Sequence, residues 1–173
     1  MGFIEHGFTE TGRELERYDF DYLGAAKYDY QDKGRPLAVL SDWQTFWYCL
    51  GMCLFTYYGY RSYPAMDSLR ALTGWSDFDL DEAIRAGERI ITLRHCFNLR
   101  EGLRPQDFTL PDRLRGVPPF EEGPTAGQTI DFETVKKDYY RERDWDPAGG
   151  WPSTSKLRQL GLDRLVGESR EEH

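Results

Sequence analysis

Two cysteines lie four residues apart in the most apolar stretch of the chain, FWYCLGMCLFTYY at residues 46–58. They are Cys49 and Cys53, and the third cysteine of the chain is Cys96. Thiolates bind iron and zinc, or oxidise to disulfides. Three cysteines cannot supply the four thiolates of a usual iron–sulfur cluster, and they lack the second Cys or His pair of a zinc site. Each thiol is therefore either a buried apolar residue or one ligand of a site completed by another piece of protein.

Composition limits the classes of function. A chain of 173 residues is expected to form one domain with its own core. Its net charge of −8 opposes binding to nucleic acid or to an anionic membrane. A hydrophobic content of 39%, with 15% aromatic residues, is too high for a disordered chain. The start has no basic segment followed by an apolar one and the cysteine count is odd, so we expect a cytoplasmic location.

The apolar stretch predicts a buried core helix, because it is too short to span a bilayer. Pro36 suits a first helical turn and Gly59 suits a left-handed end, so the predicted helix starts after Pro36 and ends at Gly59. Apolar residues occur at all of its positions, and we therefore expect it to be buried on every side.

Further helices are expected on both sides of a long loop. Helical spacing and end signals predict them at 66–75, ending at Gly74, within 76–102, within 131–146 and within 152–162. Their expected N-caps are Asp77 or Asp79 for the second and Asp131 for the third. The residues expected to face inward are Leu80, Ala83, Ile84, Ile90, Ile91, Leu93, Phe132, Val135, Tyr139 and Tyr140.

The prediction for the whole chain is an all-α, multihelical fold with little or no β structure. Residues 103–129, rich in proline and glycine, predict a long irregular surface loop. Residues 1–26 are polar and rich in glycine and aspartate, and predict a poorly ordered N-terminal arm before a helical domain at 27–173.

Several short motifs follow one another along most of the chain. They are Gly87-Glu88-Arg89, FNLREG at 97–102, Leu110-Pro111 with Arg113, Tyr139-Tyr140, Trp145-Asp146 and the ending KLRQLGL at 156–162. In this order and spacing they resemble the C-terminal region of the tungsten-containing aldehyde:ferredoxin oxidoreductases, over residues 27 to about 165. Upstream, YCLGMC at 48–53 resembles the Asp-x-x-Gly-Leu-Cys motif of that family.

The resemblance implies a function in a larger enzyme. That enzyme would oxidise an aldehyde to a carboxylic acid at a tungsten bis-pterin site and pass electrons through a [4Fe–4S] cluster to ferredoxin. This chain would be its C-terminal part, with an upstream cofactor-bearing domain or subunit as its partner. Cys53 matches the fourth cluster thiolate, and Leu50, Gly51 and Met52 match residues beside the pterin. No catalytic residue is implied in this chain.

One residue departs from the family motif. Tyr48 stands where the motif often begins with Asp. A phenol accepts hydrogen bonds from pterin N–H groups less well than a carboxylate, and it occupies more room. A second hypothesis is therefore a stand-alone helical binding or scaffold module that has lost cofactor binding.

A third hypothesis is a thiol redox protein that uses Cys49 and Cys53. These residues share one face of a helix, but helical geometry holds their Cβ atoms too far apart for an undistorted disulfide. We expect Cys49 and Cys96 to be core thiols and His95 to be a core or rim residue rather than a ligand.

The isolated chain is expected to be a monomeric, mostly helical and inactive protein without bound metal or pterin. Because it should normally pack on a cofactor-bearing domain, we also expect an exposed apolar, aromatic patch near Gly51 and Cys53.

Overall fold

The computed structural model describes residues 28–53 and 65–165, and these ranges contain helices and loops but no strand. The helices are α2 (Gly34–Cys49), α4 (Ala65–Thr73), α5 (Leu80–Arg100), η1 (Pro105–Asp107), α6 (Asp112–Arg115), α7 (Phe132–Arg143), α8 (Thr154–Gln159) and η2 (Asp163–Leu165). The predicted all-α class and the long loop are confirmed. The predicted arm at 1–26 lies outside the described residues.

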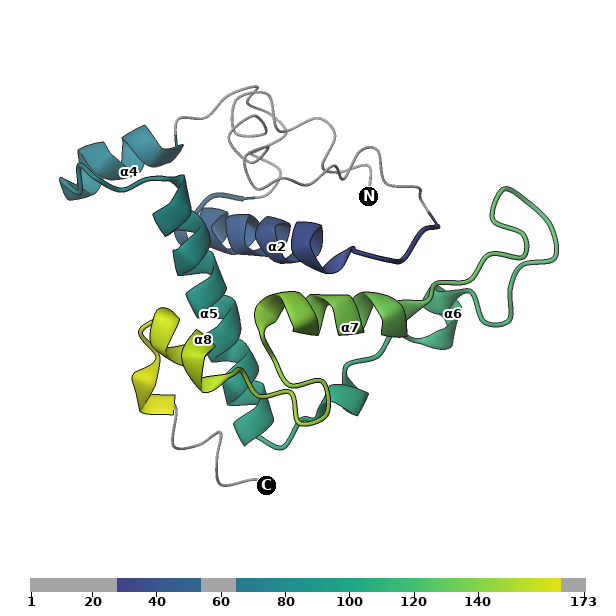
Figure 1. The fold of residues 1–173 in the computed structure, drawn as a ribbon. Helices are drawn as coiled ribbons and strands as arrows, with labels where there is room; N and C mark the ends of the chain where they lie inside the picture. Colours follow the sequence, from purple (N-terminus) through teal and green to yellow (C-terminus); the bar gives the residue numbers. More distant parts are fainter. Residues whose placement is uncertain (1–27, 54–64, 166–173) are drawn as a thin grey trace.

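The helices form a crossed arrangement around the long helix α5. Helices α2 and α7 lie side by side, α5 crosses them, α8 packs beside the second half of α5, and α4 extends from its first half (Figure 1). Two apolar clusters hold these elements together. One joins α2, α4 and the first half of α5 around Trp43 and Phe46, and the other joins the second half of α5 to Trp151 and Leu157.

Helix α2 differs from its prediction at both ends. It begins at Gly34, so Pro36 lies within its first turn, and it ends at Cys49 rather than at Gly59. The chain turns at Gly51, whose φ of 72° is a left-handed conformation that favours glycine. Nor is α2 buried on every side, since Tyr48 is 53% exposed and the Cys49 side chain is exposed. A run of apolar residues signals burial but not the point at which a helix stops.

The predicted ends of the other helices agree better with the structure, because their signals are local. The Asp79 carboxylate accepts a hydrogen bond from the backbone N–H of Glu82, and Asp131 does the same for Thr134. Gly74 and Gly102 take left-handed conformations just beyond α4 and α5. One inward prediction on α5 is wrong: Leu93 is exposed, and Thr92, His95, Cys96 and Leu99 fill the buried face instead.

Two glycines allow helices to approach very closely. A Cβ atom added to Gly87 on α5 would lie 2.0 Å from the carbonyl oxygen of Asp42 on α2. A Cβ atom added to Gly34 on α2 would lie 2.2 Å from the carbonyl oxygen of Asp138 on α7. Both neighbours are backbone atoms, which cannot rotate away as a side chain can. The two contacts therefore fix how α5 and α7 sit against α2.

Gly87→Ala is expected to destabilise the fold although alanine is the better helix former. The added methyl group must push α5 away from α2, and overpacking of this kind costs about 1–3 kcal/mol of unfolding free energy. Urea unfolding followed by circular dichroism would measure the loss. Ala86→Val, which adds volume at the neighbouring and less buried position of α5, is the control and should change stability less. Equal stability of Gly87→Ala and the parent chain would contradict the close contact.

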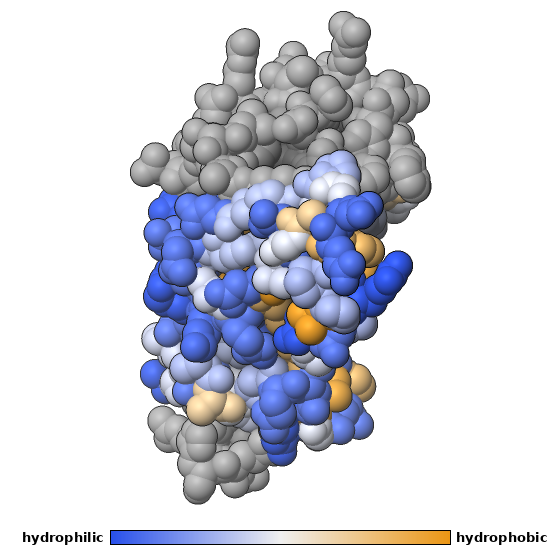
Figure 2. Space-filling view, turned by 90° about the vertical axis from the view of Figure 1, so that its right-hand side faces the viewer, coloured by the Kyte–Doolittle hydropathy of each residue, from blue (hydrophilic) through white to orange (hydrophobic). Residues whose placement is uncertain are grey.

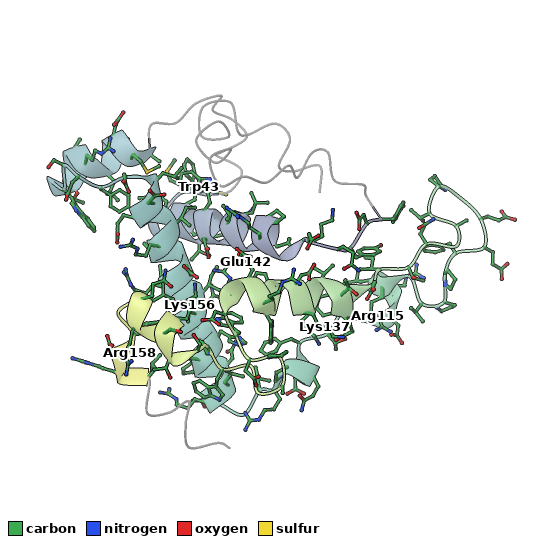
Figure 3. All side chains as sticks on the ribbon, viewed as in Figure 1. Trp43, Arg115, Lys137, Glu142, Lys156 and Arg158 are labelled. Atoms are coloured by element: carbon green, nitrogen blue, oxygen red, sulfur yellow. The ribbon has the colours of Figure 1, made fainter. Side chains whose placement is uncertain are left out.

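A buried network of charges joins α2, α5, α7 and α8. The Arg143 guanidinium lies 2.7 Å from the Asp42 carboxylate and also donates to the Ala38 carbonyl and the Ser41 hydroxyl. Arg143 also lies 4.0 Å from Glu88, which pairs with Lys156 at 2.8 Å. Lys156 lies on α8, next to α5 (Figure 3). Burial raises the pKa of Asp42 to about 7, against the opposing charge of Arg143.

Candidate functional site

The turn that follows α2 holds the residues selected from the sequence. Leu50 caps α2, with its N–H bonded to the Trp47 carbonyl, and the Gly51 N–H donates to the Tyr48 carbonyl. The side chains of Leu50 and Met52 pack against the first apolar cluster. No atom of the described residues lies within 4 Å of the position where a Cβ atom of Gly51 would be. Leu50 and Met52 thus hold the turn against the core, and no side chain of the described residues covers Gly51.

The three cysteines form no disulfide and differ in exposure. Cys49 and Cys53 are exposed at the end of α2, whereas Cys96 is buried on α5 in the second apolar cluster. The expectation of a core thiol is confirmed for Cys96 and is wrong for Cys49. No group of three or more His, Cys, Asp or Glu residues is placed to hold a metal ion within residues 28–53 and 65–165.

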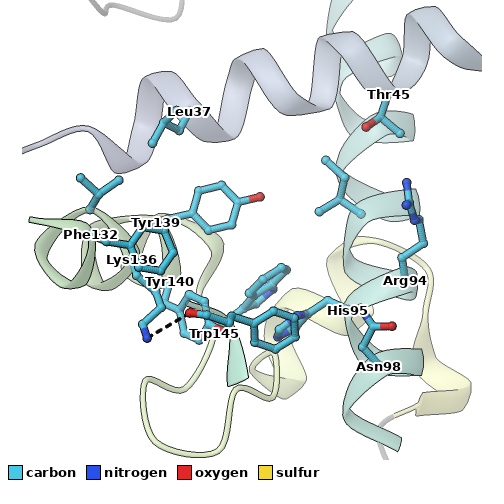
Figure 4. Close-up of a pocket in the computed structure, with 13 residues that line it drawn as sticks. Leu37, Thr45, Arg94, His95, Asn98, Phe132, Lys136, Tyr139, Tyr140 and Trp145 are labelled. Atoms are coloured by element: carbon cyan, nitrogen blue, oxygen red, sulfur yellow. Dashed lines mark hydrogen bonds between the residues drawn. The ribbon is translucent and has the colours of Figure 1, made fainter. Parts of the chain in front are cut away.

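A pocket of about 510 Å³ lies between α2, α5, η1 and α7 (Figure 4). Its walls are mostly aromatic and aliphatic, and Arg94, His95, Asn98 and Lys136 add polar groups. The Lys136 ammonium group pairs with Glu133 at 3.0 Å and donates to the carbonyls of Pro105 and Phe108. The sequence did not single out this pocket, because its residues come from segments that only the fold brings together.

His95 is packed in the wall of this pocket. Its ring stacks on Trp145 with centroids 3.7 Å apart and planes 2° from parallel. Its Nε2 atom lies 2.9 Å from the Gly150 carbonyl oxygen, which can only accept, so Nε2 carries the proton of the neutral ring. Burial lowers the pKa of His95, with the charge of Arg143 acting in the same direction. The expectation of a core or rim residue is confirmed.

The low pKa of His95 predicts a loss of stability in mild acid. The unfolded chain protonates this histidine near its ordinary pKa of 6.5, whereas the folded chain does so only at lower pH. As pH falls below 6.5, protons therefore favour the unfolded state. Urea unfolding of the parent chain and of His95→Gln across mildly acidic pH would test this. The parent should lose more stability than His95→Gln, and parallel losses would contradict the prediction.

The comparison with known proteins places the chain in a family. A family model described as aldehyde ferredoxin oxidoreductase, domains 2 and 3, matches residues 7–162, which is most of the chain. This chain belongs to the aldehyde ferredoxin oxidoreductase family. The match begins at residue 7 and so includes much of the segment predicted to be an arm.

Individual relatives agree with the family assignment. The chain is 38% identical over 117 residues to a tungsten-containing aldehyde ferredoxin oxidoreductase of Pyrococcus abyssi, covering 67% of this chain and 19% of the relative. It is 36% identical over 132 residues to the enzyme of that name from Pyrococcus furiosus, covering 76% of this chain and 21% of the relative. With the Thermococcus kodakarensis enzyme the identity is 34% over 136 residues, covering 78% and 22%. The chain thus spans about a fifth of the length of these relatives.

Residues that match motifs of this oxidoreductase family hold the helices together. Gly87 permits the crossing of α2, and Glu88 pairs with Lys156. The Arg89 Nε atom donates to the Leu160 carbonyl at 2.7 Å. Gly87, Glu88 and Arg89 thus connect α5 to α2 and α8, so this motif has a structural role.

The FNLREG motif contains the end of α5 and a residue that lines the pocket. Gly102 ends α5 in a left-handed conformation, and Arg100 lies 3.5 Å from Glu101. Asn98 of this motif does not act as a cap. It lies inside α5 and lines the pocket.

The turn after α2 fits one corner of an iron–sulfur cluster and cannot hold a whole one. A cluster needs thiolates that converge from rigid elements. Cys53 offers one exposed sulfur, and its neighbours Leu50 and Met52 are fixed by packing. With Cys96 buried in a separate cluster of residues, the other thiolates of such a site would have to come from outside this chain.

Proposed function

We propose that this chain is the C-terminal part of a tungsten-pterin, iron–sulfur enzyme that oxidises an aldehyde to a carboxylic acid and passes electrons to ferredoxin. The observation that supports this most is the exposed Cys53 sulfur beside the open, left-handed Gly51, in a chain that matches family domains 2 and 3. When bound, the pterin-held metal supplies the oxidation of the aldehyde, and the cluster supplies electron transfer.

The role proposed for this chain is to bind and position. Cys53 supplies one thiolate to the cluster. Gly51 lets the backbone approach the pterin, because glycine has no side chain and none from the described residues occupies the space beside it. Leu50 and Met52 contribute their backbone groups, since their side chains pack inward and hold the turn in place.

The proposed partner is the cofactor-bearing part of the same enzyme, which would cover the end of α2. Tyr48 is 53% exposed there, and exposed apolar groups of this kind mark contact surfaces when they gather. On α4 and just after it, Leu72 and Trp75 are also exposed. By contrast, the side of the molecule in Figure 2 is mostly hydrophilic with isolated hydrophobic spots.

Tyr48 favours a second candidate, a helical scaffold module that has lost cofactor binding. Its phenol replaces a carboxylate that would accept hydrogen bonds from the pterin. In this alternative the chain would pack on the same partner but add neither a thiolate nor a pterin contact.

Metal content tests the proposed function directly. We expect the chain alone to purify without iron or tungsten, because its three cysteines cannot supply the four thiolates of a cluster. Produced together with a family segment that contains the other cluster cysteines, it should copurify as a brown complex with stoichiometric iron. Stoichiometric iron in the chain alone would contradict the shared site. A complex whose iron does not depend on Cys53 would favour the scaffold.

None of the helices among the described residues is long and apolar enough to span a membrane. Ferredoxin as electron acceptor is a proposal drawn from the resemblance, and a cytoplasmic location is a proposal drawn from the odd number of cysteines.

A further inference from the structure

The pocket between α2, α5 and α7 has the features of a binding site for a small molecule. Its volume of about 510 Å³ is within the usual range for such sites, which have mostly apolar walls and a few polar groups. Here Leu37, Ile91, Phe108, Phe132 and Val135 supply apolar wall. Leu50, Gly51, Met52 and Cys53 are not among the residues that line it.

Several hydrogen-bond donors of the pocket have no acceptor among the described residues. Arg94 and Asn98 lie one turn apart on α5, and neither side chain makes a hydrogen bond or ion pair within the described residues. In the wall, the Tyr140 hydroxyl and the Trp145 N–H also have no acceptor within residues 28–53 and 65–165, and both atoms are covered from solvent. The carbonyls of Pro105 and Phe108 already accept from Lys136. The Arg94 guanidinium and the Asn98 amide group are therefore available to donate to a ligand, and the Asn98 oxygen and the His95 Nδ1 atom are acceptors beside them.

Among the described residues that line the pocket, Arg94 is a cation without a counter-ion. Lys136 is paired with Glu133, and His95 is neutral because burial lowers its pKa. Arg94 therefore provides the unbalanced positive charge. A guanidinium group matches a carboxylate, which accepts two parallel N–H bonds.

We propose that this pocket binds a small organic carboxylate with an aromatic or branched aliphatic body. The carboxylate accepts hydrogen bonds from Arg94 and Asn98, and the body lies among Ile91, Phe108 and Phe132. The site uses neither Cys53 nor a metal, so it stands independently of the function proposed above.

Titration calorimetry of the whole chain with phenylacetate would test this site. We expect saturable binding of phenylacetate and about tenfold weaker binding of its neutral analogue phenylacetamide, because the amide cannot pair with Arg94. Inorganic phosphate should bind more weakly than phenylacetate, because it leaves the apolar wall uncovered. Binding should also change the tryptophan fluorescence, since Trp145 is part of the wall.

Two arginine variants of α5 make a matched pair. Arg94→Gln should weaken phenylacetate binding about tenfold, and Arg100→Gln should leave it unchanged, because Arg100 is exposed beside Glu101 and does not line the pocket. Both side chains lie at the surface, so neither variant should unfold the chain. Lack of saturable binding, equal binding of the amide or of phosphate, or equal effects of the two variants would overturn the proposal. None of these outcomes depends on metal content.

Discussion

Asp42→Ala is expected to lower the unfolding free energy by about 3–5 kcal/mol, the usual effect of removing one member of a buried ion pair. Arg143 is 1% exposed in its side chain, and without Asp42 its charge would stay in the core with Glu88 as the remaining anion, 4.0 Å away. A buried charge without close compensation is costly because it has lost its water. Urea unfolding at about pH 8, above the pKa of Asp42, would measure the change.

Two controls separate burial from charge in this experiment. Asp67→Ala removes an acid from the exposed pair with Arg70 on α4 and should cost less than about 1 kcal/mol. The double variant Asp42→Leu with Arg143→Met removes both charges and should be more stable than Asp42→Ala alone, since no charge is left unpaired. If Asp42→Ala were as mild as Asp67→Ala, the pair would not be a core interaction.

Cys53→Ser is expected to remove or strongly alter the iron–sulfur signal of the complete enzyme. Thiolate is a soft and strong ligand for iron, whereas a serine oxygen is harder and gives up its proton far less readily. Electron paramagnetic resonance of the reduced complex, together with its iron content, would show the loss.

Cys49→Ser is the matched control for this experiment. Cys49 is also exposed and lies four residues earlier in the sequence, at the last residue of α2. We expect Cys49→Ser to keep a normal cluster. The reverse result would mean that Cys49 is the ligand, and normal clusters in both variants would show that the chain is only a scaffold.

Local sequence signals predicted most of the helices because their physical causes are local. An Asp79 or Asp131 carboxylate bonds to an N–H three residues ahead, and Gly74 or Gly102 takes a left-handed conformation, whatever the rest of the chain does. The order of the family motifs along the chain was likewise enough to indicate the family, which the match over residues 7–162 confirmed.

The end of α2 and the exposed residues Tyr48, Cys49 and Leu93 were not predictable in this way. Each is apolar or aromatic enough for a core, and its exposure depends on which neighbour packs against it. In the structure α5 turns His95 and Cys96 inward and leaves Leu93 outside. Periodicity gives the face of a helix only when one face alone is apolar.

By itself the sequence determined the all-α class, the N-cap of α7, two candidate N-caps for α5 and the family to which this chain belongs. Only the tertiary structure decided that Gly87 lies where α5 crosses α2 and that Arg143 pairs with Asp42 across 101 residues of sequence. It also decided that Arg94 lines the same pocket as residues of α7. The reason is physical. A cap or a turn depends on atoms a few residues apart, whereas a buried pair or a pocket exists only where distant segments meet and exclude water.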